Sequence, residues 1–121
     1  MKKLLIALLL VSPFSFADWG DVYYCQMTSL VDTHIDGTVE QYKLQKFQFK
    51  LDETRRAMVF GNSSFLGDMV MELVDGKHFP AQEFWWGYSE YGRSFFEKGR
   101  FLFSMVSVRG ITSISANCDK F

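Results

Sequence analysis

The chain has 121 residues, of which 22% are charged and 48% hydrophobic, and its formal net charge is −1 at pH 7. A chain of this length makes one small domain. Its charges are scattered, with no basic stripe that could follow a phosphate backbone, so nucleic acid is excluded as an expected partner.

The first 17 residues have the three parts of a signal peptide. Two lysines give a positive start, residues 4–11 form an unbroken apolar run, and small residues precede a cleavage site. The run is too short for a membrane-spanning helix, which needs about 20 apolar residues, and Pro13 follows it. The two-lysine start resembles a bacterial secretion signal. We therefore expect residues 1–17 to be removed, and residues 18–121 to form one periplasmic or secreted domain that is not inserted in a membrane.

The rest of the chain alternates apolar and polar residues with period two and shows no sustained helical periodicity. Residues 22–31 begin this pattern, and Asp36-Gly37 marks the first turn. Residues 39–51 have the length of one long strand. Its apolar residues move from even to odd positions near Gln45, which predicts a β-bulge there. The end of that strand should alternate between the core and water, with Phe47, Phe49 and Leu51 inside and Lys46, Gln48 and Lys50 outside.

Further short strands follow, each bounded by turn residues. Asp75-Gly76 is a dipeptide favoured in two-residue hairpins, and Pro80 cannot donate to a ladder, so it marks an edge or a break. The predicted segments are residues 57–61, 69–74, 77–79, 84–88, 93–97, 101–106 and 111–118. About eight short strands in about 100 residues predict an all-β antiparallel meander, closed as a barrel or packed as a sandwich.

Two cysteines, Cys25 and Cys118, lie on the first and last predicted strands. An even cysteine count in an exported chain indicates a disulfide. The bond requires Cα atoms within about 7 Å, so the first and last strands must be close. That requirement favours the closed barrel.

Residues 32–37 (Asp-Thr-His-Ile-Asp-Gly) are the most metal-like segment. They begin like a calcium loop, but the twelfth position is Lys43, where a bidentate Glu belongs. In an extended segment Asp32, His34 and Asp36 would share a face and could bind a transition metal. Asp and Gly are also the residues that turns require, so we expect a hairpin loop with no metal and no cofactor.

A small secreted hydrolase is the less favoured alternative. The serines lie in no G-x-S-x-G elbow, and the histidines are His34 and His78. The carboxylates of Glu83, Glu90 and Glu97 flank an aromatic segment, but nothing in the sequence positions two of them across a cleft, as a glycosidase requires.

Aromatic residues are concentrated between residues 84 and 96: Phe84, Trp85, Trp86, Tyr88, Tyr91, Phe95 and Phe96. Neighbouring strand residues point to opposite faces, so one of Trp85 and Trp86 should be much more exposed than the other, although parity does not say which. We expect the exposed one to anchor a binding surface for a protein, carbohydrate or lipid, extended by Tyr88 or Tyr91 with Glu90 at its rim. The alternative is that the whole cluster packs in the core or under a loop.

The chain length, the export signal, Tyr24-Cys25 on the first strand and Cys118 near the end resemble the small periplasmic C-type lysozyme inhibitors. The resemblance covers the two ends and the architecture, and it implies an eight-stranded barrel that binds an enzyme through a loop. The Ser-Gly-containing loop of that family has no clear counterpart here, so no site residue is carried over. We expect a binding module, with an enzyme inhibitor and a secreted hydrolase as alternatives.

Overall fold

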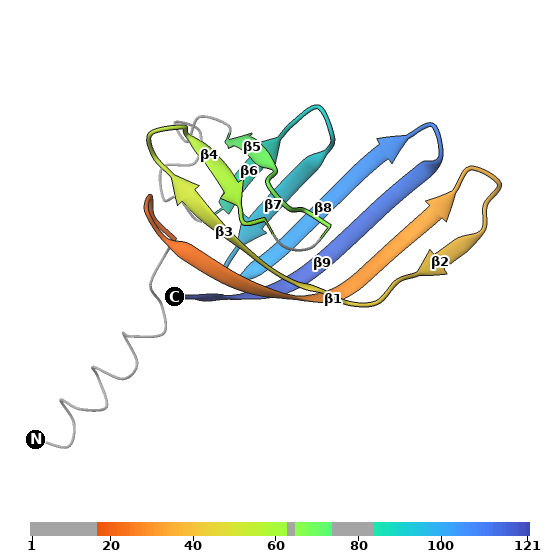
Figure 1. The fold of residues 1–121 in the computed structure, drawn as a ribbon, viewed down its shortest axis with the longest axis horizontal. Helices are drawn as coiled ribbons and strands as arrows, with labels where there is room; N and C mark the ends of the chain where they lie inside the picture. Colours follow the sequence, from red (N-terminus) through yellow and green to blue (C-terminus); the bar gives the residue numbers. More distant parts are fainter. Residues whose placement is uncertain (1–16, 63–64, 74–83) are drawn as a thin grey trace, which may run out of the picture.

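The computed structural model describes residues 17–62, 65–73 and 84–121, and these residues form nine antiparallel strands and no helix (Figure 1). In chain order the strands are β1 (Val22–His34), β2 (Val39–Gln41), β3 (Lys46–Asp52), β4 (Ala57–Phe60), β5 (Val70–Leu73), β6 (Phe84–Tyr88), β7 (Arg93–Glu97), β8 (Arg100–Ser107) and β9 (Gly110–Lys120). The predicted strand at residues 77–79, the hairpin at Asp75-Gly76 and residues 1–16 of the predicted export signal lie outside the described residues.

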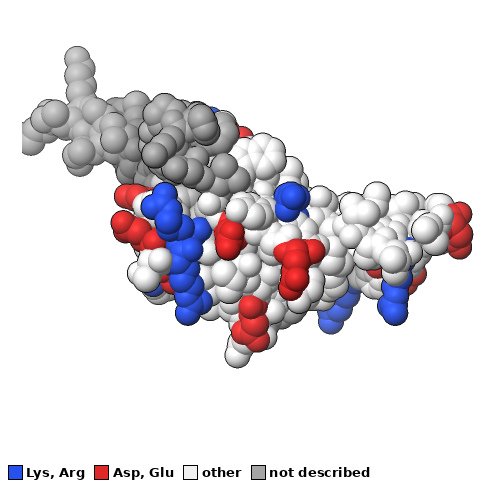
Figure 2. Space-filling view, turned by 90° about the horizontal axis from the view of Figure 1, so that it is seen from above, with Lys and Arg blue, Asp and Glu red and all other residues white. Residues whose placement is uncertain are grey.

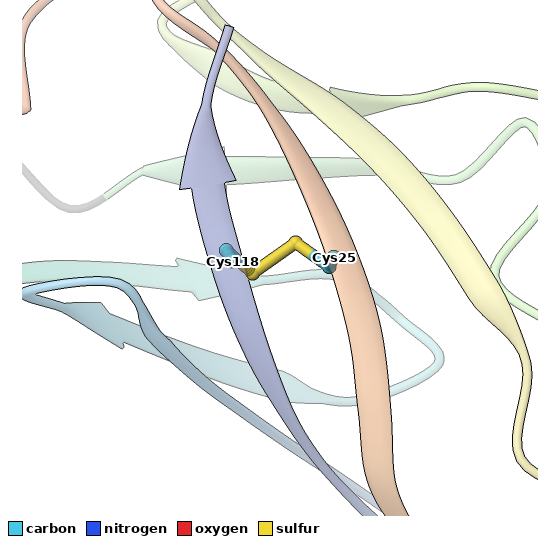
Figure 3. The surroundings of a disulfide bond; sticks show 2 residues. All are labelled: Cys25 and Cys118. Carbon is cyan, nitrogen blue, oxygen red and sulfur yellow. A yellow bond between two sulfur atoms is a disulfide. The ribbon is translucent and has the colours of Figure 1, made fainter.

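Eight of these strands close into a barrel. Strands β3 to β9 pair with their neighbours in chain order, and β1 pairs with β3 on one side and with β9 on the other. Cys25 and Cys118 lie directly opposite each other in the β1–β9 ladder and form a disulfide (Figure 3). The predicted antiparallel barrel, with its first and last strands joined by a disulfide, is therefore confirmed, and the sandwich alternative is not adopted.

Aromatic side chains fill the barrel. Phe49, Phe96 and Phe101 are each almost completely buried, although they come from three different strands. The ring centroids of Phe49 and Phe96 lie 5.1 Å apart with the rings edge to face, which is a favourable arrangement of the two quadrupoles. The predicted parity of β3 is confirmed, because Phe47, Phe49 and Leu51 are buried while Lys46, Gln48 and Lys50 are exposed.

The prediction of one strand over residues 39–51 with a bulge near Gln45 is wrong. The segment forms two strands, β2 and β3, separated by residues 42–45. Both strands pair with β1, with β3 along its first half and β2 along its second half. Because β1 has 13 residues, it is long enough to take two successive partners on one side. The irregular segment between β2 and β3 absorbs the change in parity.

Strands β1, β8 and β9 continue past the barrel, where β2 pairs with β1, and Figure 1 shows this projection as two hairpins side by side, β8–β9 and β1–β2. We call this projection the wing and define it as residues 31–34, β2, 105–107 and 110–113. The two hairpin turns are tied together, since the backbone N–H of Ile35 donates to the carbonyl of Arg109 at 3.0 Å.

Candidate functional site

Strand β6 separates the two adjacent tryptophans of the aromatic cluster. Trp85 is 4% exposed and Trp86 is 43% exposed, so the prediction that one would be much more exposed is confirmed. The Trp85 ring meets Trp19 edge to face, with the centroids 4.9 Å apart. Its indole N–H is buried and has no hydrogen-bond partner among the described residues, where the contribution of Trp85 is apolar packing. Trp86 is therefore the tryptophan of β6 that is available to a partner.

Strand register assembles an apolar surface around Trp86 on the outside of the barrel. Trp86 lies opposite Phe95 of β7, which in turn lies opposite Leu102 of β8. The Trp86 and Phe95 centroids are 5.0 Å apart with an interplanar angle of 71°. Phe84 stacks on the same Phe95 ring at 5.8 Å. We call this surface the outer platform: Phe84, Trp86, Tyr88, Phe95 and Leu102.

Tyr88 forms one end of the outer platform and is held between two charges. It lies opposite Glu72 of β5 on one side and Arg93 of β7 on the other. The hydrogen bond to Glu72, together with the negative charge of that carboxylate, raises the pKa of Tyr88, and Arg93 opposes this effect. The Arg93 guanidinium lies 5.5 Å from the centre of the Tyr88 ring, at cation–π distance. One end of the outer platform is therefore a phenol that lies between a negatively charged and a positively charged side chain.

The turn after β6 presents Tyr91 and Glu90 to solvent. It is closed by a hydrogen bond from the Ser89 backbone N–H to the carbonyl of Gly92, and the Ser89 hydroxyl accepts a bond from the Tyr91 backbone N–H. A hydrogen bond to the Glu90 side chain raises the pKa of Tyr91. Of the five residues predicted for the site, Trp86, Tyr88, Tyr91 and Glu90 are therefore on the surface, whereas Trp85 is in the core.

The sequence could not identify the neighbours that complete the outer platform. Leu102, Arg93 and Glu72 come from three other strands. Only the strand register places Leu102 beside Phe95, and Arg93 and Glu72 beside Tyr88. In the view of Figure 2, a column of Lys and Arg side chains stands beside acidic side chains at one end of the described surface, and elsewhere the charged side chains are isolated groups separated by uncharged surface.

The candidate metal ligands Asp32, His34 and Asp36 each contact a different residue. Asp32 accepts a hydrogen bond from the Thr112 hydroxyl at 2.7 Å, and Nε2 of His34 lies 3.0 Å from Oε1 of Glu40. Asp32 and His34 belong to β1, so of the three candidate metal ligands only Asp36 lies in the turn. Hydrogen bonds from Thr38 lower the pKa of Asp36. Across the described residues, no group of three or more His, Cys, Asp or Glu side chains is placed to hold a metal ion, and His78 and Glu83 lie outside those residues.

No helix in the described part of the chain is long and apolar enough to cross a membrane. No model of a known protein family matches the chain, and no curated protein sequence matches it significantly.

Proposed function

We propose that this protein is an exported binding module that recognises its partner through the outer platform, with Trp86 as the anchor. The observation that carries the proposal is the outward position of Trp86 on a rigid surface of packed rings. Phe95 fixes the indole, so little side-chain freedom would be lost on binding. Tryptophan and tyrosine combine a large apolar area with a polar tip, and they are enriched where proteins bind partners.

The polar groups beside the platform support a partner that offers both apolar area and hydrogen-bonding groups. Tyr88 is fixed by Glu72 and Arg93, and the Tyr91–Glu90 pair stands on the adjoining turn. A sugar ring or a protein surface has this combination, whereas a lipid tail would use only the rings. The export signal predicted at residues 1–17 and the disulfide are compatible with a role in the periplasm or outside the cell.

The proposal is tested by binding assays with two defined sets of probes. One set is insoluble polysaccharide, namely chitin, cellulose and peptidoglycan, and the other is the soluble periplasmic protein fraction offered to immobilised, oxidised protein. Trp86→Ala should reduce capture of the bound probe at least tenfold, because truncation of an interface anchor commonly costs 2 kcal/mol or more. The melting temperature should stay within a few degrees, as for other surface changes.

Tyr24→Ala is the matched control. Tyr24 is also an exposed aromatic residue on the outside of the barrel, but it lies on β1, where its ring packs against Phe121. Binding by this variant should equal that of the unaltered protein. Equal binding by Trp86→Ala and the unaltered protein would remove the platform from the proposal.

A further inference from the structure

The outside of the barrel changes from apolar to polar where the outer platform ends. Leu102, the platform residue on β8, lies directly opposite Ser115 of β9. The next outward pair on the same two strands is Ser104 and Ser113, and both side chains are exposed. Asn117 follows Ser115 on the outer side of β9 and is also exposed. We call this surface the polar patch and define it as four residues: Ser104, Ser113, Ser115 and Asn117.

The polar patch consists of groups that both donate and accept hydrogen bonds. Ser115 is held in place from β1, because its hydroxyl lies 2.6 Å from Oγ1 of Thr28 and donates to the hydroxyl of Ser29 at 3.3 Å. A hydroxyl has one donor and two acceptor positions, so these two bonds leave Ser115 with an acceptor position for a ligand. The patch therefore matches a ligand that is itself rich in hydroxyl groups.

The charges around this surface balance each other. Arg93 lies opposite Ser104 on one side and Tyr88 on the other, and Tyr88 lies opposite Glu72. Arg100 lies opposite Asn117 on one side and Glu97 on the other. Two positive charges thus stand against two negative ones at the edges, and the four residues of the polar patch are uncharged. The arrangement favours an uncharged ligand over an anionic one.

The outer platform and the polar patch together have the size of a small ligand. They cover three strand spacings of about 4.8 Å and four residue steps of about 3.4 Å, which gives about 14 Å by 14 Å, or about 200 Å². A specific protein interface buries about 800 Å² on each partner. Serine is also depleted at protein interfaces, whereas it makes up most of the polar patch. Area and composition both favour a small hydroxyl-rich ligand over a protein.

We infer that the outer platform and the polar patch together bind an uncharged oligosaccharide. The inference rests on the proposed function and assigns the class of its ligand. A sugar ring has an apolar face of C–H groups and a rim of hydroxyl groups. One ring packs its apolar face on Trp86, and a ring further along the chain places its hydroxyl groups against Ser104 and Ser113. A lipid tail would leave the polar patch unused.

The test is isothermal titration calorimetry of the oxidised protein with chitohexaose, cellohexaose and maltohexaose up to about 5 mM, a range that reaches weak affinities. At least one of these uncharged chains should bind. The double variant Ser104→Ala with Ser113→Ala should bind it about tenfold more weakly, because two hydrogen bonds are lost. Ser113→Ala alone should weaken binding about threefold, and it serves if the double variant does not fold.

Thr54→Ala is the matched control, since Thr54 is exposed in the turn between β3 and β4, outside the surface described above. It should bind like the unaltered protein. The inference is overturned if none of the three chains binds, or if the double variant and Thr54→Ala bind equally well. Capture of a periplasmic protein that depends on Trp86, without binding of any of the chains, would overturn the inference and leave the proposed function standing. Equal binding of the oligosaccharide by Trp86→Ala and the unaltered protein would overturn the proposed function itself.

Discussion

Tyr23 gives the folded protein a measurable response to alkaline pH. Its ring stacks on Phe49 with centroids 5.5 Å apart and meets Phe96 edge to face at 4.7 Å. Burial, with a smaller effect of the Asp21 charge, raises the pKa of Tyr23 from 10.0 to about 12. Below pH 10 the phenol is neutral in both folded and unfolded chains. Between pH 10 and 12 the unfolded chain loses this proton first, so the folded state loses about 2 to 3 kcal/mol of stability.

Tyr23→Phe should therefore move the midpoint of alkaline unfolding to higher pH. The measurement is circular dichroism across pH 9 to 13, a range that contains the pKa of Tyr23 in both states. Tyr24→Phe changes an exposed neighbour on the same strand and should leave the midpoint in place. An unchanged midpoint in Tyr23→Phe would show that this phenol is not protected in the folded barrel.

The sequence predicts that successive side chains alternate between the two faces of a strand. It does not predict which of the two tryptophans points outward. Alternation requires that Trp85 and Trp86 point to opposite faces. The choice between them depends on β7 and β8, because the row of Trp86, Phe95 and Leu102 is set by pairing between strands. Those contacts are not local in sequence, so the outer platform could be predicted only in part.

Two neighbouring residues of strand β3, one buried and one exposed, test whether its side chains alternate between the core and water. Phe49→Ala should cost about 3–5 kcal/mol, because it opens a cavity among the rings of Phe96 and Phe101. Gln48→Lys changes the next residue on the solvent side and should cost less than about 0.5 kcal/mol. Urea denaturation of both variants measures the two values. Similar losses of stability in the two variants would contradict the assignment of faces.

Elements bounded by tight turns were the ones that the sequence predicted well. The ranges predicted for β6 and β7 agree with the structure, since β6 ends and β7 begins at the turn of residues 89–92. The segment of residues 39–51 was predicted poorly because its division depends on the length of β1 and on which half of β1 each part pairs with. The wing arises from the same long strand, so the sequence does not predict it either.

The disulfide acts on the molecule as a whole because it joins strands that are 93 residues apart in sequence. The β1–β9 ladder continues for two residue pairs on one side of the bond and for eight pairs on the other, so closure of the barrel does not depend on the bond alone. Reduction should lower the free energy of unfolding by about 2–5 kcal/mol, with the folded barrel retained. Urea titrations with and without reductant measure the change. Identical midpoints under the two conditions would show that the bond adds no stability.

The proposed binding function depends most on an outward Trp86 next to a buried Trp85 on strand β6. Acrylamide quenching of tryptophan fluorescence tests this directly when the unaltered protein is compared with Trp86→Phe. Trp86→Phe should lose most of the quenchable emission, and its spectrum should shift to shorter wavelength, since Trp85 is buried and Trp19 is partly covered. A quenchable fraction unchanged by this substitution would contradict the outward position of Trp86, because the exposed indole would then lie elsewhere.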